Sequence, residues 1–117
     1  MIEGVALILS NQAHCFKDTD EILFPVLQKA ILVDKIHFAD TKSWYYGMEL
    51  FNRTSQETAE KYSIPFVDQQ VVFKEKSELF LYQDTVHMTP EGIELKARLF
   101  FNKIVELRHL EQLGGGQ

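Results

Sequence analysis

A chain of 117 residues is long enough for one compact domain and too short for two. Its composition argues against disorder, because 45% of the residues are hydrophobic, nine Phe and four Tyr among them. The formal net charge of -5 results from 17 acidic and 12 basic residues without a basic stripe, which argues against nucleic acid as a main ligand.

Neither a membrane span nor a bound metal is expected. No run approaches the roughly 20 apolar residues that a spanning helix needs, and the pattern of a signal peptide is absent, so the localisation stays open. The single cysteine, Cys15, cannot form an internal disulfide. Its neighbour His14 would point to the opposite face of an extended segment, and His37 and His109 are isolated. We therefore predict a surface loop for His14 and Cys15, no metal site and no cofactor.

The first half of the chain predicts a strand and a helix. Residues 5–9 form a continuous apolar run, which is typical of a strand covered on both faces in a parallel sheet. The polar residues 10–12 then predict a loop at the end of this strand. Apolar residues recur at helical spacing over residues 22–33. Residues 34–46 have no clean period, so we expect an irregular connection with a short strand near 36–38.

The second half predicts two better-defined helices with a strand between them. The first covers residues 48–62, the strand covers 64–68, and residues 71–81 are expected to form a loop with a turn of helix. In the last helix Thr89 is a natural N-cap, and the helix reaches roughly Leu110. The apolar face of the first helix is predicted to contain Met48, Phe51, Ala59 and Tyr62, and that of the last helix Ile93, Ala97, Phe100, Ile104 and Leu107.

This order of elements predicts an α/β fold, namely a partial three-layer, flavodoxin-like parallel sheet with flanking helices. The expected organisation is a single domain over residues 1–112 and a flexible tail over residues 113–117. Only two or three strands are predicted, whereas open parallel sheets usually contain more. We therefore expect the sheet to be incomplete.

The segment with the clearest chemical content is residues 82–92, where Asp84 stands three residues before His87 in a loop ahead of the last helix. A loop can turn both side chains towards each other, so that Asp84 accepts a hydrogen bond from Nδ1 of His87. That bond fixes the tautomer, leaves Nε2 free as a base and stabilises the imidazolium formed during reaction. A serine hydroxyl needs such a proton acceptor to become a nucleophile. Taken alone, Asp-x-x-His is more often a loop carboxylate and histidine that cap the following helix.

The surrounding residues resemble the last conserved block of the SGNH (GDSL-type) hydrolase family. The resemblance implies a Ser-His-Asp triad in which His87 is the general base and Asp84 its orienting acid. Residues 64–68 look like the family's penultimate strand, which ends in an acid, and residues 5–9 look like the strand before it. The matching block reads Asp84-x-x-His87-Met88-Thr89-Pro90-x-Gly92.

Two other blocks of that family are absent from these 117 residues, namely the Gly-Asp-Ser that carries the nucleophile and the Gly-x-Asn-Asp that helps to form the oxyanion hole. The resemblance therefore implies the C-terminal half of the domain, with little esterase activity of its own. An N-terminal segment or a companion chain would supply the serine. Ser10, with Asn11 as a donor, is the alternative nucleophile, although it lacks the neighbouring glycine and aspartate.

A second hypothesis is a non-catalytic interaction or assembly module. Missing strands leave an exposed sheet edge, which favours pairing with another chain or a homo-oligomer. A hydrogen-bonded Asp84–His87 pair that opens onto a pocket would favour the esterase, whereas burial of His87 would favour the module. The aromatic residues 44–46 either line an acyl or sugar pocket or pack against the sheet.

Overall fold

The computed structural model describes residues 4–19, 40–81 and 86–114. The helix predicted over residues 22–33 and the strand predicted near 36–38 lie outside these ranges. No helix within them is both long enough and apolar enough to cross a membrane. The elements in chain order are β1 (Leu9–Ser10), α2 (Thr41–Lys61), β2 (Phe66–Val67), α3 (Gln69–Phe73), the 3-10 helix η1 (Ser77–Leu79) and α4 (Pro90–Gly114).

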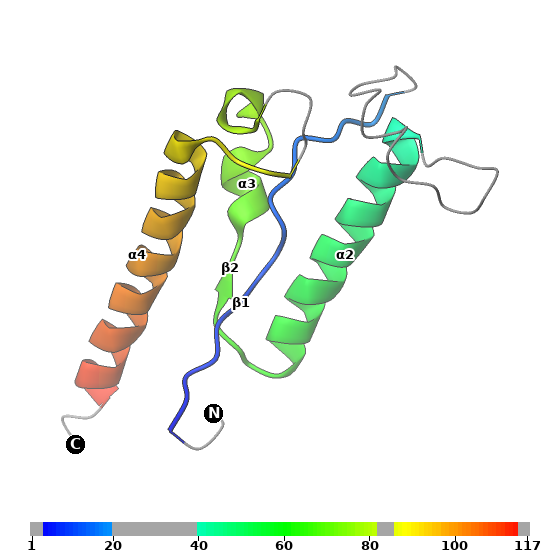
Figure 1. The fold of residues 1–117 in the computed structure, drawn as a ribbon. Coiled ribbons are helices and arrows are strands. Elements are labelled where there is room, and N and C mark those ends of the chain that lie inside the picture. Colours follow the sequence, from blue (N-terminus) through cyan, green and yellow to red (C-terminus); the bar gives the residue numbers. More distant parts are fainter. Residues whose placement is uncertain (1–3, 20–39, 82–85, 115–117) are drawn as a thin grey trace.

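The described part of the chain combines helices with a small parallel sheet, as the sequence predicts. Leu9 lies opposite Phe66 and Ser10 lies opposite Val67, so β1 and β2 run in the same direction. Figure 1 shows the two strands between α2 and α4. Both strands fall at or near the ranges that the sequence assigns to them, although each has only two paired residues.

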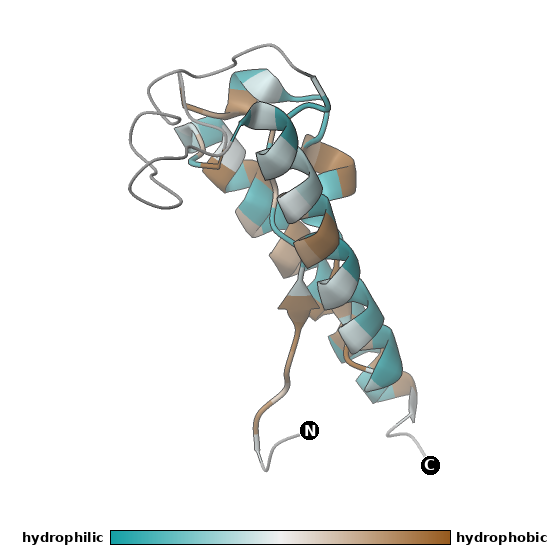
Figure 2. Cartoon of the chain, turned by 90° about the vertical axis from the view of Figure 1, so that its right-hand side faces the viewer, coloured by the Kyte–Doolittle hydropathy of each residue, from teal (hydrophilic) through white to brown (hydrophobic). Residues whose placement is uncertain are grey.

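The predicted burial of the first apolar run is wrong. Val5 and Leu7 are 54% and 43% exposed. Figure 2 shows this apolar segment as it runs towards the N-terminus. The run has the composition of a strand covered on both faces. In the structure only its last two residues, Ile8 and Leu9, are half-buried, whereas residues 5–7 are exposed.

Helix α2 begins earlier than the sequence predicts. Asp40 is its N-cap, and the Asp40 carboxylate accepts a hydrogen bond from the backbone N–H of Ser43 at 2.7 Å. The irregular connection expected over residues 34–46 is therefore wrong from Thr41 onwards. The aromatic residues that start the helix have low helix propensity, and this obscured the capping signal of Asp40.

The face of α2 that packs inwards also differs from the prediction. Ala59 is buried as expected, but Phe51 and Tyr62 are 56% and 62% exposed. The buried position between them belongs to a polar residue, Asn52. The Asn52 side chain accepts from the backbone N–H of Gln12 at 2.8 Å and donates to the Gln12 carbonyl oxygen at 2.9 Å. Because Oδ1 and Nδ2 of Asn52 each have a hydrogen-bond partner, an asparagine is stable at this inner position.

Helix α4 begins where the sequence predicts and continues beyond Leu110 to Gly114. Leu113 and Gly114, assigned to the expected tail, thus belong to its last turn. The predicted inward face is only partly correct, because Phe100 and Leu107 are half-buried but Ile93 and Ile104 are 58% and 52% exposed. The helix packs against the core through Leu95 and Leu99. An outward apolar row remains, which we call the α4 stripe; it consists of Ile93, Ala97, Phe101, Ile104 and Val105.

The core lies at the α3 end of the molecule. Its buried members are Ala13, Cys15, Phe73 and Phe80, and the rings of the two phenylalanines meet edge to face at 6.0 Å. The surface loop predicted for His14 and Cys15 is wrong, because their exposed fractions are 0% and 4%. Alternation on an extended segment does place adjacent side chains on opposite faces. In this segment both faces are covered, so His14 and Cys15 are buried on opposite sides.

Candidate functional site

The loop before α4 is fixed by its main chain. Leu81 donates its backbone N–H to the carbonyl oxygen of His87, and Thr89 donates to that of Leu79, both at 2.9 Å. An antiparallel bridge joins the two segments between these bonds. These bonds hold the backbone of His87, which is an exposed residue.

Close packing explains the Thr-Pro-x-Gly sequence that follows His87. The Thr89 hydroxyl oxygen accepts from the backbone N–H of Gly92 at 3.2 Å, which caps α4. Gly92 is buried, and a Cβ atom at this position would lie 2.5 Å from the carbonyl oxygen of Leu79 and 3.0 Å from Cβ of Met88. Only glycine allows the first turn of α4 to approach η1 so closely. This contact fixes where α4 begins relative to η1.

The other predicted member of the pair, Asp84, lies outside the described residues. Its hydrogen bond to His87 stays a prediction. Figure 1 shows the loop before α4 at the same end of the molecule as α3, which directly follows β2. This is the carboxyl end of the parallel strands, where open α/β sheets bind their ligands.

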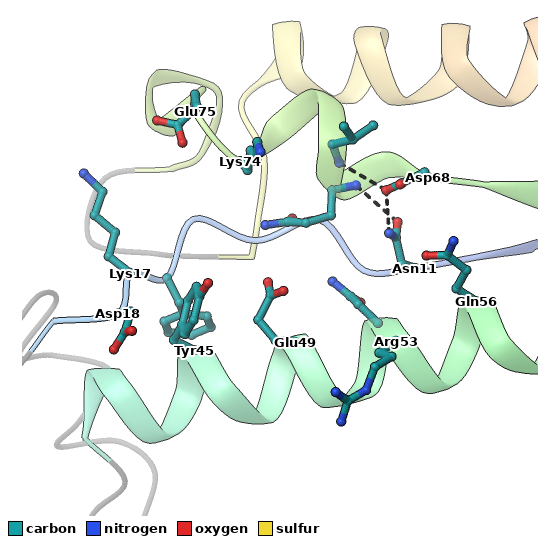
Figure 3. Close-up of a pocket in the computed structure, with 14 residues that line it drawn as sticks. Asn11, Lys17, Asp18, Tyr45, Glu49, Arg53, Gln56, Asp68, Lys74 and Glu75 are labelled. Atoms are coloured by element: carbon teal, nitrogen blue, oxygen red, sulfur yellow. Dashed lines mark hydrogen bonds between the residues drawn. The ribbon is translucent and has the colours of Figure 1, made fainter.

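At this end Asn11 joins the two strand termini. Its Nδ2 donates to Oδ1 of Asp68 at 2.6 Å, and its Oδ1 accepts from the backbone N–H groups of Gln69 and Gln70 at 2.7 and 3.2 Å. Oδ1 of Asp68 also accepts from the backbone N–H of Val71 at 3.1 Å and so caps α3. Figure 3 shows this group of side chains beside the cleft described below.

The alternative nucleophile, Ser10, belongs to the same group. Its hydroxyl accepts a hydrogen bond from Nε2 of Gln69 at 3.1 Å. Within residues 4–19, 40–81 and 86–114 the structure gives Ser10 no histidine as a hydrogen-bond partner. The described contacts of Ser10 are therefore those of a strand end that holds α3.

A buried histidine lies behind the aromatic residues of this end. Nε2 of His14 is 3.2 Å from Oε1 of Glu49, and its ring contacts those of Phe16 and Tyr45. Among the described residues Nδ1 of His14 has no hydrogen-bond partner. Burial lowers the pKa of His14 below its ordinary value of 6.5, and the hydrogen bond and charge of Glu49 oppose this effect. His14 is therefore held in the neutral form near pH 7.

Between α2 and α3 lies an open polar cleft of about 680 Å³ (Figure 3). Tyr45, Glu49 and Arg53 follow one another at four-residue intervals, so they occupy one face of α2, and all three line the cleft. Figure 3 shows the Glu49 carboxylate directed towards α3 and the Arg53 side chain turned away from it. The full lining comprises Asn11, Phe16, Lys17, Asp18, Tyr45, Glu49, Asn52, Arg53, Gln56, Asp68, Gln70, Val71, Lys74 and Glu75. His87 does not line this cleft.

Tyr45, which lines the cleft, and its neighbour Tyr46 remain protonated near neutral pH. Burial raises the pKa of Tyr45, and the carboxylates of Glu49 and Asp18 raise it further. The Tyr46 hydroxyl donates to Oδ2 of Asp18 at 2.9 Å, and this bond raises the pKa of Tyr46. The Tyr45 hydroxyl is therefore available as a neutral donor and acceptor.

Sequence reasoning did not find the cleft or the Asn11–Asp68 contact. The four-residue spacing of Tyr45, Glu49 and Arg53 is a local signal of one helix face that could have been found. The contact between Asn11 and Asp68 joins residues 57 positions apart, and no local pattern encodes it. The aromatic residues 44–46 are predicted either to line a pocket or to pack; Tyr45 lines the cleft, whereas Trp44 stacks on Phe16.

Comparisons with protein-family models, curated proteins and solved structures found no match for this chain. In the part of the chain that the structure describes, no group of three or more His, Cys, Asp or Glu side chains is placed to hold a metal ion.

Proposed function

We propose that this chain supplies the acid-and-base half of an SGNH-type serine-esterase site, with His87 as general base and Asp84 as its orienting acid. In this proposal the nucleophilic serine and the oxyanion donors come from another segment or a companion chain. The two described strands are then part of a larger three-layer, flavodoxin-like sheet. The substrate class is an ester or acetyl ester of a lipid or a carbohydrate.

The observation that carries the proposal is the geometry of the loop before α4. The main chain of His87 and Thr89 is held by hydrogen bonds to Leu81 and Leu79, and the close approach of Gly92 to Leu79 fixes the start of the helix. The loop lies at the carboxyl end of the strands and presents an exposed His87. A general base needs these two properties, a fixed backbone and an accessible imidazole.

The chemistry would proceed by acyl transfer. Nε2 of His87 takes the proton of the serine hydroxyl as its oxygen attacks the ester carbonyl carbon, and the imidazolium then gives that proton to the leaving alkoxide. Water attacks the resulting acyl-serine by the same route and releases the acid. Asp84 keeps Nδ1 of His87 protonated and stabilises the imidazolium, so its removal lowers turnover without removing the base.

The dimensions of the chain support an incomplete domain. Its radius of gyration is 17.4 Å, whereas a compact domain of this length has a value of about 13 Å. Its accessible surface is 8672 Å², against about 6,600 Å² for a compact monomer of the same mass. The α4 stripe adds apolar surface that a further segment would cover.

The proposal is tested by measuring hydrolysis of p-nitrophenyl acetate by the purified chain, alone and co-purified with a polypeptide from its source that contains Gly-Asp-Ser and Gly-x-Asn-Asp. We expect no turnover above buffer by the chain alone, and turnover together with fluorophosphonate labelling of the companion's serine for the complex. His87→Ala should abolish turnover of the complex. Asp84→Asn should reduce it by about 10⁴-fold, because the wrong tautomer of His87 is then favoured.

His109→Ala is the matched control, because His109 is exposed and lies near the C-terminal end of α4, whereas His87 precedes its first residue. It should leave turnover unchanged. Normal turnover by the isolated chain, fluorophosphonate labelling of the chain itself, or full activity of the His87→Ala complex would each overturn the proposal.

The second candidate is a non-catalytic assembly module, and one observation favours it. Among the described residues β1 pairs with β2 alone, so its other side has no described strand and can pair with a second copy of the chain. A stable homodimer that binds no companion and is unaffected in assembly by His87→Ala would favour this function over the esterase.

A further inference from the structure

The cleft between α2 and α3 has walls that are fixed by hydrogen bonds within the protein. Gln70 binds the main chain of His14 twice, accepting from its N–H at 2.8 Å and donating to its carbonyl oxygen at 3.1 Å. Asn52 binds the main chain of Gln12 in the same bidentate way. These amides hold the extended segment after β1 against α3 on one side and against α2 on the other. The cleft therefore exists before any ligand enters.

A second set of side chains in the same cleft keeps its capacity for hydrogen bonding. In the part of the chain that the structure describes, the Tyr45 hydroxyl and the Arg53 guanidinium have no hydrogen-bond partner, and Glu49 shares one carboxylate oxygen with His14. Lys74 and Glu75 stand on the α3 side (Figure 3). Each side of the cleft thus contributes both a basic and an acidic side chain.

The charges of the lining nearly cancel. Three basic side chains, Lys17, Arg53 and Lys74, face four acidic ones, Asp18, Glu49, Asp68 and Glu75. Neither sign is concentrated, so the cleft does not suit a phosphate or a nucleic acid, which need clustered cations. The polar lining does not suit an acyl chain, which needs an apolar wall.

Two aromatic side chains add apolar surface to the polar lining of the cleft. Tyr45 and Phe16 both line the cleft. The ring of Phe16 also stacks on the ring of Trp44, with a distance of 5.6 Å between the ring centroids. A ring face provides apolar contact for the C–H side of a sugar, and paired carboxylate and guanidinium groups bind its hydroxyls. The volume of about 680 Å³ lies in the range of sites that hold such ligands.

We propose that this cleft binds a neutral oligosaccharide, through the row Tyr45, Glu49 and Arg53 of α2 and the facing polar residues of α3. Binding at this site needs neither a serine nor Asp84 and His87. The binding proposal can therefore be tested independently of the proposed esterase function. If both hold, the cleft is a site that anchors a carbohydrate apart from the reacting ester.

The test is a binding measurement on the full chain, by isothermal titration calorimetry and ligand-observed NMR, with four neutral probes: cellohexaose, xylohexaose, maltohexaose and chitohexaose. Inorganic phosphate and hexanoate represent the rival ligand classes. We expect saturable binding of at least one hexasaccharide and none of phosphate or hexanoate. Glu49→Gln and Arg53→Gln should each weaken binding by about tenfold or more, because each removes a charge-assisted hydrogen bond.

Two matched variants control for charge and fold. Glu57→Gln changes an exposed carboxylate that lies two helical turns after Glu49 on α2 and does not line the cleft. Arg108→Gln likewise removes an exposed basic group, on α4, that does not line the cleft. Both should bind like the unaltered chain. Tyr45→Phe keeps the ring and tests the hydroxyl alone, with circular dichroism as a check on folding.

The proposal is overturned if no hexasaccharide binds, or if folded Glu49→Gln and Arg53→Gln variants bind as tightly as the control variants. Saturable binding of phosphate or hexanoate in preference to the sugars would also overturn it. None of these measurements depends on esterase activity, so a negative result for one proposal does not contradict the other.

Discussion

His14 is fully buried, and Glu49 is the charged group that faces it. The imidazole also contacts Phe16 and Tyr45, so its surroundings are largely aromatic. Desolvation disfavours the imidazolium, and the nearby carboxylate only partly compensates, so the pKa of His14 is lowered. A neutral buried histidine links folding to pH.

The first prediction concerns this linkage. In the unfolded chain His14 takes up a proton near its ordinary pKa of 6.5, whereas in the folded chain it does so only at lower pH. Between these two values the unfolded state binds more protons, so the free energy of unfolding falls as the pH falls. Urea denaturation at pH 7.5 and pH 5.5 should therefore show a loss of stability that His14→Gln reduces.

His109→Gln serves as the control, because His109 is exposed. It should retain the pH dependence of the unaltered chain. If His14→Gln and the unaltered chain lose the same stability between the two pH values, the burial of His14 does not determine this dependence.

At the scale of elements, the start of α4 and η1 fit each other through Gly92. The second prediction is that Gly92→Ala lowers the free energy of unfolding by about 1–3 kcal/mol, because the new Cβ would overlap the carbonyl oxygen of Leu79 and force one element to move. Gly47 is the matched glycine, since it lies inside α2 and a Cβ atom added there would meet no atom within 4 Å.

Gly47→Ala should raise the free energy of unfolding by about 0.5–1 kcal/mol, because alanine restricts the unfolded chain and suits a helix interior. Urea denaturation measures both variants. Equal effects of the two substitutions would contradict the close approach of α4 to η1.

Elements with local signals were predictable, and faces that depend on distant partners were not. The start of α4 follows from Thr89 and Pro90 alone, so the sequence locates it correctly. The inner face of α2 depends on Asn52, whose amide is satisfied by a main chain 40 residues away. No helical periodicity reveals such a partner, so a polar inner residue is read as outward.

The candidate site divides in the same way. Residues 84–92 carry a compact local pattern, from which the Asp84–His87 pair is predicted; Asp84 lies outside the described residues, so the pair stays a prediction. The cleft was not predictable, because its two walls come from α2 and α3 and meet only in the folded chain. The cleft-lining row of Tyr45, Glu49 and Arg53 is the only part that the sequence alone could have indicated.

At the scale of the whole molecule, the α4 stripe is an exposed apolar row that shares Ile93, Ala97 and Ile104 with the predicted inward face. The described residues offer it no partner element, since α4 packs through its other side. Apolar rows of this size mark interaction surfaces in soluble proteins. We expect the isolated chain to associate with itself through this surface when no companion covers it.

The third prediction is that Phe101→Glu abolishes this association, measured as the concentration dependence of the sedimentation coefficient. Its effect on the free energy of unfolding should stay within about 0.5 kcal/mol, because Phe101 is 63% exposed. Asn102→Glu adds the same charge one residue further along and outside the stripe, and should leave the association intact. A strictly monomeric unaltered chain would contradict this prediction.

Two paired residues per strand give too few ladder bonds to align β1 with β2 by themselves. A shift of one position would turn each side chain to the opposite face of the sheet. The Asn11 amide would then point away from Asp68, and the N–H groups of Gln69 and Gln70 would lose their shared acceptor. The hydrogen bonds of Asn11 thus set the register of the two strands. In larger sheets the register is set by many hydrophobic contacts.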